Sequence, residues 1–534
     1  MDIFSRFCQI LVLILSALIL TGCVMGEPPI ATPNPDFAVN LNQPTEAEMP
    51  PQAAPRAPIT RAAGGKLRIA MPMATTLNPL LNSDPDVDAV LRLIFEPLVV
   101  LDADKRPRPN PAITHSVVFS ADGGSLVISL YDDIFWEDGS PITSGDIAFS
   151  IDVLRFSAPE GALYRPNVEN VVSHAVLDSR TLQINLHYPM WAMKYMLNFP
   201  IIPAEYYRHV PMTNLTAARN MHPLGNGPFR FLSYEAAGSL ELIANEFAAG
   251  GTPYISQVTA MVLRDISGAR YAFEQGLTDV LASSPYDWGR YSVLGKTRAA
   301  EVLTGQFDFV GFNARRPLFA HYGARLAVSH SFDLEAVLQR YFVQSDAANA
   351  PINPESWLAA YDLREPYFNP ALAVAYFVQL EEVPQITIIV NVANPEGVGT
   401  ATILAEGLER AGAYVNLEIL PFAAFVSRVD TADFDIVVGG IMVPPVPHLG
   451  FLYSLLGYSS EELNLALAMM RHAPSEYALI HASGVVQRYV AENLPIMGVA
   501  FRRQVLYTTE HVRGTIEISS NDIFANVAEW FIAN

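Results

Sequence analysis

Cysteine is missing from residues 24–534 of this 534-residue chain. The two cysteines of the sequence, Cys8 and Cys23, both lie within its first 23 residues. The rest of the chain can therefore form no disulfide, and it can hold neither a cysteine nucleophile nor a thiolate metal site. An oxidising compartment outside the cytoplasm would not damage such a chain.

Charged residues are also scarce, and positive charge is scarcer than negative charge. Charged side chains make up 16% of the sequence and hydrophobic ones 51%, and the formal net charge is −21. A surface of this sign repels nucleic acid, so no nucleic-acid partner is expected. After the first 22 residues no apolar run reaches the ~18 residues of a membrane-spanning helix, which predicts a soluble body.

The motifs of the common catalytic centres are absent. The sequence contains no HExxH, GxSxG, SxxK or GxxxxGK segment, so zinc-protease, serine-hydrolase, lactamase-like and P-loop chemistry lack their central residues. No two of the eleven histidines stand three or four positions apart, which is the helical spacing of paired metal ligands. We therefore predict that the chain is not an enzyme and has no metal site.

One segment imitates a dinucleotide-binding fingerprint. Gly397 and Gly399 lie between an expected strand and an expected helix, and Glu418 follows about twenty residues later. However, Thr402 stands in place of the third glycine, and residues 393–396 separate the strand from the first glycine, so a phosphate would not meet a tight strand-to-helix turn. We interpret the segment as a helix start and expect no cofactor.

The N-terminus has the features of an export signal. A short apolar run, Ile10–Leu20, is too short to span a bilayer comfortably, which favours a secretory signal over a membrane anchor. Leu20–Cys23 (Leu-Thr-Gly-Cys) resembles a bacterial lipobox, which implies a signal peptide at residues 1–22 and a lipid on Cys23. An ordinary cleavable signal with an incidental cysteine is the alternative.

The next stretch has the composition of a tether. Residues 24–64 contain nine prolines, many alanines and almost no aromatic residues, a composition that cannot bury enough apolar surface to fold. We therefore predict a disordered Pro/Ala-rich tether at 23–64. About 470 residues follow from Lys66, which exceeds the size of a single core and predicts at least two lobes.

A strand-turn-helix unit lies near the centre of the N-terminal half, at Phe135–Arg155. Asp138-Gly139 supplies a turn dipeptide, and Thr143 stands three residues before Asp146, the spacing of a capping box. The apolar residues that follow fall on one helical face: they are Ile147, Ile151 and Leu154.

Alternating strands and helices are expected along the rest of the chain, with no repeat at a fixed period. The expected strands are 67–71, 126–130, 181–186, 229–234, 240–244, 307–312, 386–392, 414–420 and 436–439. The expected helices are 87–95, 334–341 and 400–411. This order predicts a mixed α/β class.

The residue pattern of the central unit resembles that of a known family. Residues 135–150 read F-x-x-DG-x-P-x-T-x-x-D-x-x-F-S, which resembles the signature of the peptide/nickel class (family 5) of extracellular solute-binding proteins of ABC importers. Further fragments of that pattern occur in the same order, from about Gly65 to the C-terminus. They are Thr76–Pro79, Ile94–Leu98, Pro200–Pro203, Gly225–Phe229, Ala272–Gly276, Gly311–Asn313 and Arg325–Ser329.

The resemblance implies a two-lobed, periplasmic-binding-protein-like (type II) α/β fold with mixed β-sheets and a ligand cleft between the lobes. In the numbering of this chain, lobe I is expected at 66–282 plus 500–534, with a subdomain at about 86–199. Lobe II is expected at 283–499. Hinge strands would join the two lobes.

The resemblance also implies a function. The expected protein is a monomeric lipoprotein that captures a peptide or peptide-like solute by closing its lobes and delivers it to an ABC permease with its ATPase subunits. It would be exported and held by the lipid on Cys23 at the outer face of the bacterial cytoplasmic membrane, in the periplasm of a host with two membranes. The alternatives are an exported enzyme or structural α/β domain, and a receptor for a chelated metal such as nickel.

Ligand-binding residues follow from the same resemblance. The strand end that faces the cleft corresponds to Met73, Ala74 and Thr75, and a family aromatic that approaches the ligand backbone corresponds to Tyr164. The other expected ligand-binding residues are Tyr286, Trp288, Asn313, Gly440, Met442 and His448. Packing in the hinge is the alternative role for Tyr286 and Trp288.

The sequence departs from the family at the amine-binding segment. Peptide-binding relatives carry W-x-x-D-Y-x-[DE]-P after a strand like 434–439, and its aspartate pairs with the peptide α-amine. Residues 440–450 contain no carboxylate and no tryptophan here. An ammonium group buried without a counter-charge is costly, so free-amine di- and tripeptides are expected to bind poorly. A carboxylate from elsewhere, such as Asp287 or Glu355, is the alternative.

Overall fold

The computed structural model describes residues 63–283, 290–291, 297–361, 363, 367–380, 383–444, 446 and 450–533. The chain divides into two units, and the larger one, Ala62–Asn534, contains all of the described residues. Cys23 and nearly all of the expected tether lie outside the described residues. Within those residues, no helix has both the length and the apolar character needed to cross a membrane.

A four-stranded sheet opens the fold. Its strands, in spatial order, are β1 (Lys66–Met71), β10 (Gln257–Val262), β9 (Ser239–Ala244) and β8 (Phe229–Tyr234). β1 runs parallel to β10, and the other pairs are antiparallel. Leu67, Ile69 and Met71 alternate with more exposed residues and point into the core, as the period of a half-buried strand requires.

A second sheet carries the central strand-turn-helix unit. It is antiparallel, with the order β4 (Thr114–Phe119), β5 (Ser125–Leu130), β7 (Thr181–Leu186) and β6 (Val171–Val176). A small hairpin, β2 (Val99–Leu101) with β3 (Pro107–Pro109), precedes it, and β18 (Val512–Arg513) pairs with β19 (Phe531–Ile532) near the C-terminus.

The expected capping box is confirmed. The Asp146 carboxylate accepts hydrogen bonds from the backbone N–H of Thr143 at 2.8 Å and from its hydroxyl at 3.0 Å. Helix α3 (Ser144–Asp152) begins directly after Thr143. Ile147, Ile151 and Leu154 are fully buried, as the helical spacing predicts.

A seven-stranded mixed sheet organises the C-terminal half. Its order is β11 (Val280–Ser283), β17 (Ile496–Thr509), β12 (Thr297–Phe312), β16 (Ile436–Met442), β14 (Gln385–Asn391) and β15 (Tyr414–Leu420), with β13 (Asp346–Ala347) beside β17. β14 runs parallel to β15 and β16, whereas the pairs made by β12 and β17 are antiparallel.

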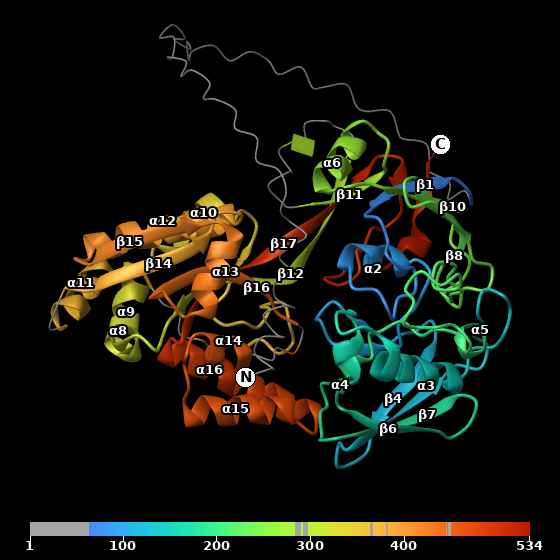
Figure 1. The fold of residues 1–534 in the computed structure, drawn as a ribbon, viewed down its shortest axis with the longest axis horizontal. Coiled ribbons are helices and arrows are strands. Elements are labelled where there is room, and N and C mark those ends of the chain that lie inside the picture. The colour runs from blue at the N-terminus through green and yellow to red at the C-terminus, as the bar shows by residue number, and fades with distance from the viewer. Residues whose placement is uncertain are drawn as a thin grey trace, which may run out of the picture. The chain divides into compact units, whose positions relative to one another are not determined.

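The two long strands β12 and β17 connect the parts of the fold, and Figure 1 shows them side by side. The C-terminal end of β17 pairs with β11, and the N-terminal end pairs with the part of β12 that also pairs with β16. Asp279, next to β11, forms an ion pair with Arg68 of β1 at 2.6 Å. These strands therefore link the first sheet to the large one.

Helices cover the sheets and complete the cores. They are α2 (Pro85–Leu91), α3, α4 (Met193–Met196), α5 (Ala204–Tyr207), α6 (Ile266–Glu274), α8 (Pro317–Ala320), α9 (Tyr322–Ser331), α10 (Leu334–Tyr341), α11 (Pro370–Val378), α12 (Pro395–Arg410), α13 (Phe422–Asp430), α14 (Gly450–Leu455), α15 (Glu461–Arg471) and α16 (Glu476–Asn493). One core combines most buried residues between 67 and 280 with C-terminal residues such as Trp530. Two others lie around the large sheet, and one of them also includes Met190, Trp191, Ala192 and Tyr195.

The helix expected at 87–95 ends earlier than the sequence pattern indicates. Beyond α2, the carbonyl of Ile94 accepts hydrogen bonds from Asn226 N at 3.0 Å and Gly227 N at 2.7 Å. The loop comes so close that a Cβ on Gly225 would lie 2.0 Å from that carbonyl oxygen. The Ile94 carbonyl therefore bonds to this distant loop instead of continuing the helix.

Two glycines flank the same residue of β12 and give a matched test of packing. Phe309 pairs with Gly498 of β17 on one side and with Gly439 of β16 on the other. A Cβ on Gly498 would lie 1.8 Å from the backbone oxygen of Ala348, whereas a Cβ on Gly439 would meet nothing within 4 Å. We predict that Gly498→Ala lowers the free energy of unfolding by about 2 kcal/mol or more, while Gly439→Ala is neutral or slightly stabilising. Urea denaturation of both variants checks this, and equal losses would contradict it.

Glu137, in the turn of the central unit, predicts a pH dependence of stability. Burial raises the pKa of Glu137 to about 7, although its hydrogen bond from the backbone N–H of Gly225, at 3.1 Å, opposes the rise. The folded state holds the proton more tightly than the unfolded state, so stability falls as the pH rises from about 4.5 to about 7.

We predict that Glu137→Gln removes this slope and stabilises the protein above pH 7 by up to about 3 kcal/mol. Thermal denaturation between pH 4.5 and pH 8 measures it. The exposed Glu169→Gln is the control and should keep the wild-type slope. A wild-type slope in the Glu137 variant would refute the assignment.

Candidate functional site

The strand end expected to face the ligand lies directly after β1. Met73 is 65% exposed and Thr75 is also exposed, whereas Ala74 between them is buried. The backbone N–H of Ala74 donates a 2.9 Å hydrogen bond to the hydroxyl of Tyr234 in β8. Tyr234, on the edge strand opposite β1, therefore holds the segment, and the sequence pattern gave no signal for it.

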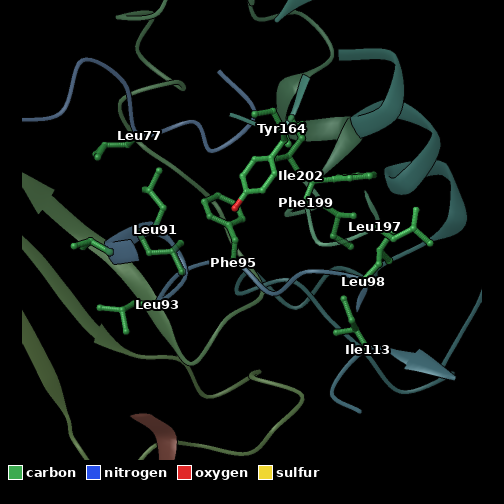
Figure 2. Packing of buried hydrophobic residues seen from close by; sticks show 14 of the residues in the cluster. Leu77, Leu91, Leu93, Phe95, Leu98, Ile113, Tyr164, Leu197, Phe199 and Ile202 are labelled. Atoms are coloured by element: carbon green, nitrogen blue, oxygen red, sulfur yellow. The ribbon is translucent and has the colours of Figure 1, made fainter. Parts of the chain in front are cut away.

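Tyr164 lies inside the N-terminal core. Figure 2 shows its ring among the side chains of Phe95, Phe199 and Ile202. The Tyr164 hydroxyl donates a hydrogen bond to Asp88 Oδ2 at 2.7 Å and accepts one from Arg92 at 2.7 Å. Burial raises the pKa of Tyr164 well above its usual value, so the phenol keeps its proton.

Asn313 follows β12 and is fully buried. Its amide donates to the backbone oxygens of Ala432 at 2.9 Å and Phe434 at 2.8 Å. Both donors of the side chain are therefore used to hold the loop before β16. Asn313 therefore stabilises this loop, and its expected contact with a ligand stays a prediction.

Gly440 and Met442 lie at the end of β16. Met442 is 53% exposed and stands opposite Gln306 of β12. A Cβ on Gly440 would lie 2.5 Å from the Gln306 amide nitrogen and 2.9 Å from Asp308 Oδ1. A residue with a side chain at position 440 would thus displace the polar side chains of β12.

A charged network adjoins Gly440. Arg502 of β17 donates two 2.6 Å hydrogen bonds to the carboxylate of Asp308, which is only 3% exposed. Arg502 also donates to Glu396 at 3.1 Å and to Asn394 at 2.9 Å, both at the start of α12. The network ties β12, β17 and α12 together beside the end of β16.

Burial and charge act in opposite directions in this network. Burial raises the pKa of Asp308, and the hydrogen bonds and charge of Arg502 oppose the rise. Burial by itself would lower the pKa of Arg502, but the contacts with Asp308 and the charge of Glu396 outweigh it and raise that pKa. Arg502 therefore stays charged and pairs with the carboxylates of both Asp308 and Glu396. A charged residue in the apolar strand 307–312 was the signal that sequence reasoning missed.

The expected residues divide between the two large parts of the fold. Met73, Ala74 and Thr75 follow the first sheet, whereas Gly440 and Met442 belong to the seven-stranded sheet. Tyr286, Trp288 and His448 lie outside the described residues, as does Asp287. Glu355, the other carboxylate considered for amine binding, is paired with Arg503 at 3.1 Å and with Lys105 at 3.5 Å.

No metal centre is found in the part of the chain that the structure describes. No group of three or more histidine, cysteine or acidic side chains there could hold a metal ion. A cavity of about 240 Å³ lies beside β13, and its described lining includes Asn349, Tyr361 and Gln487 but no charged side chain. It contains none of the residues expected from the sequence.

Solved structures share this fold. A Listeria monocytogenes ABC transporter substrate-binding protein, CtaP, superposes with a TM-score of 0.79 at 18% identity, covering 88% of this chain and 100% of that one. Brucella suis NikA in complex with Fe(III)-EDTA gives 0.72 at 19% identity, with 88% and 100% covered. Bacillus subtilis AppA in complex with a nonapeptide gives 0.66 at 18%, with 89% and 100% covered. The expected two-lobed α/β fold is thereby confirmed.

Curated sequences point the same way. A putative ABC transporter peptide-binding protein of Brucella ovis is 28% identical over 251 residues, which are 46% of this chain and 47% of the relative. The match therefore spans about half the length of that relative. The oligopeptide-binding protein AppA of Bacillus subtilis is 20% identical over 497 residues, 86% of this chain and 90% of AppA.

A family model matches more than half of the chain. Residues 108–462 match the model described as bacterial extracellular solute-binding proteins, family 5 middle. The matched range includes the central unit, the long strand β12 and the end of β16. The chain therefore belongs to the family 5 extracellular solute-binding proteins of bacteria.

Proposed function

We propose that this chain captures a peptide or peptide-like solute between its two lobes and delivers it to the permease of an ABC importer. The observation that carries the proposal is the family match over residues 108–462, together with relatives named for peptide binding. The members of this family are solute-binding proteins of transporters, and we propose that the chain has no enzymatic activity. It acts as a monomer.

The two lobes are proposed at residues 66–282 plus 500–534 and at 283–499, with a subdomain at about 86–199. The packing supports this division, because C-terminal residues such as Leu506 and Trp530 belong to the core formed by residues 67–280. β12 and β17 then form the hinge. A solute that contacts both lobes favours the closed state through its extra contacts there.

The exposed members of the expected set are proposed to contact the solute directly. These are Met73 and Thr75 on lobe I and Met442 on lobe II, with Gly440 leaving room beside β12. Ala74 would contribute its backbone. For Tyr164 and Asn313, burial supports a role in shaping the site from behind. The proposed parts of Tyr286, Trp288 and His448 rest on the family resemblance.

The charges near Gly440 support a solute without a free α-amine at this end. Asp308 is buried and bound by Arg502, and Glu396 shares the same guanidinium. An ammonium group placed here would have to compete with an arginine that is already held at 2.6 Å. The proposed solute is therefore apolar or blocked, anionic, or a longer peptide held by its backbone.

A chelated metal is the second candidate solute. The observation in its favour is the likeness to NikA, whose structure contains Fe(III)-EDTA. Because the described residues offer no group of metal ligands, a metal would have to enter already held by its chelator. The peptide-binding names of the curated relatives favour the peptide.

Membrane anchoring through Cys23 gives the first test of this proposal. Cys23 is the only cysteine after residue 22, so Cys23→Ser should prevent lipidation and release the protein into the soluble or secreted fraction. The fold should be unchanged, because the described residues begin well after this position. Fractionation and circular dichroism measure the two effects, with Cys8→Ser as the control that stays on the membrane. A Cys23→Ser variant that remains tightly membrane-bound would refute the lipoprotein.

Calorimetry with matched peptides gives the second test. A library of free-amine di- and tripeptides should bind with affinities weaker than micromolar, since several kcal/mol of unpaired charge would oppose them. The N-acetylated forms of the same peptides should bind at least as tightly. Micromolar or tighter binding that is abolished by N-acetylation would show that a carboxylate elsewhere has replaced the missing aspartate.

A further inference from the structure

A set of direct contacts joins lobe I to lobe II away from the hinge strands. On the lobe I side it comprises Asp104–Arg106, in the turn between β2 and β3, and Tyr188–Tyr195. On the lobe II side it comprises Glu355–Trp357, between β13 and α11, and Arg471–Glu476, from the last residue of α15 to the first residue of α16. We call these residues the clasp.

Trp357 is the centre of the clasp. Its backbone N–H donates to the carbonyl of Asp104 at 3.1 Å, and its indole N–H donates to the hydroxyl of Tyr195 at 2.6 Å. That hydroxyl in turn donates to the carbonyl of Lys105 at 3.0 Å. A lobe II side chain therefore completes a hydrogen-bond chain whose other members all belong to lobe I.

Aromatic and cationic groups surround the indole. The ring of Trp191 meets the ring of Trp357 edge-on, with centroids 5.6 Å apart. The guanidinium of Arg106 lies 4.7 Å from the Trp357 ring centroid. Trp191 also donates its backbone N–H to the carbonyl of Ala473 at 2.7 Å. Separation of the lobes would expose Trp191 and Tyr195, which are only 8% and 5% exposed here.

Ion pairs connect the clasp to the hinge. Arg106 pairs with Glu476 at 3.0 Å, and Lys105 pairs with Glu355 at 3.5 Å. Glu355 also pairs at 3.1 Å with Arg503, a residue of the hinge strand β17. One lobe II carboxylate thus joins a lobe I lysine to the strand about which the lobes are proposed to move.

Two features of the clasp favour opening. The ion pair of Arg106 with Glu476 is partly exposed, with side-chain exposures of 33% and 43%, so water can replace it. Arg106 Nε is a buried donor without an acceptor among the described residues, which weakens the closed state. Apolar packing opposes opening, because Met190, Trp191, Ala192 and Tyr195 share one buried cluster with lobe II residues such as Leu358 and Leu479.

Among the described residues, the clasp contacts given above involve none of the expected ligand-binding residues. We propose that the clasp holds the two lobes closed in the absence of solute, so that solute entry and release both require Trp357 to leave Tyr195 and Arg106. This inference rests on the proposed closure of the lobes around a solute. A free protein that is mostly closed binds solute through its minor open state, which makes the clasp a control on the rate of exchange.

Distance measurements between spin labels test the clasp. Because the chain has only Cys8 and Cys23, a full-length Cys8→Ser, Cys23→Ser protein can carry unique labels at Val118→Cys and Tyr477→Cys, both exposed positions on opposite lobes. Bound solute is removed by unfolding in guanidinium and refolding. The stripped protein should show mainly the short distance expected for closed lobes.

Two kinds of variant should shift that distribution. Trp357→Ala and Arg106→Glu should each lower the ratio of closed to open molecules at least tenfold. Adding Glu476→Arg to Arg106→Glu should restore the short distance, because it rebuilds the ion pair with reversed charges; a folding defect would not be repaired in this way. Tyr361→Ala, on the same loop and 91% exposed, is the matched control and should leave the ratio unchanged.

Two results would overturn the clasp: a stripped wild-type protein that is mostly open, or a Trp357→Ala protein that remains closed. Adding a mixed library of N-acetylated peptides to the same labelled samples separates this inference from the proposed function. If the library neither binds nor changes the distances, the peptide-binding proposal fails, while the ratios measured without peptide still decide the clasp.

Discussion

The antiparallel pairing of β12 with β17 is the constraint on which the rest of the fold depends. These strands belong to the seven-stranded sheet at one end and reach β11 and Arg68 of the first sheet at the other. The buried pair of Asp308 and Arg502 lies across them, and Arg502 also binds the start of α12. Loss of one partner would leave a buried charge uncompensated, which is among the costliest defects in a core.

Neighbouring residues of β17 contact the charged network beside Gly440 and the proposed clasp. Arg502 binds the carboxylates beside Gly440, while Arg503 binds Asp346 and Glu355 and thereby reaches Lys105 of lobe I. Successive side chains of a strand point to opposite faces. β17 therefore contacts the groups near Gly440 on one face and the proposed clasp on the other.

Local structure could be predicted from local sequence patterns, whereas long-range contacts could not. The Thr143–Asp146 capping box and the strand Thr181–Leu186 could be predicted because spacing and alternation determine them. The early end of α2 could not, since it depends on a loop more than a hundred residues away that bonds to Ile94. Trp357 carries no local signal either, because its partners Tyr195 and Arg106 come from distant segments.

For the candidate site, the exposed positions such as Met73 and Met442 were named from a family resemblance, whereas the charged neighbours of Gly440 became evident only in three dimensions.

The central claim is that the chain retains a solute between its lobes. Native mass spectrometry of the full-length protein, purified gently from its host, tests it most directly. We expect a stoichiometric mass excess that disappears on denaturation and returns when the refolded protein is given a peptide extract of the host's growth medium. A mass that equals the processed protein alone, before and after exposure to that extract, would contradict the claim.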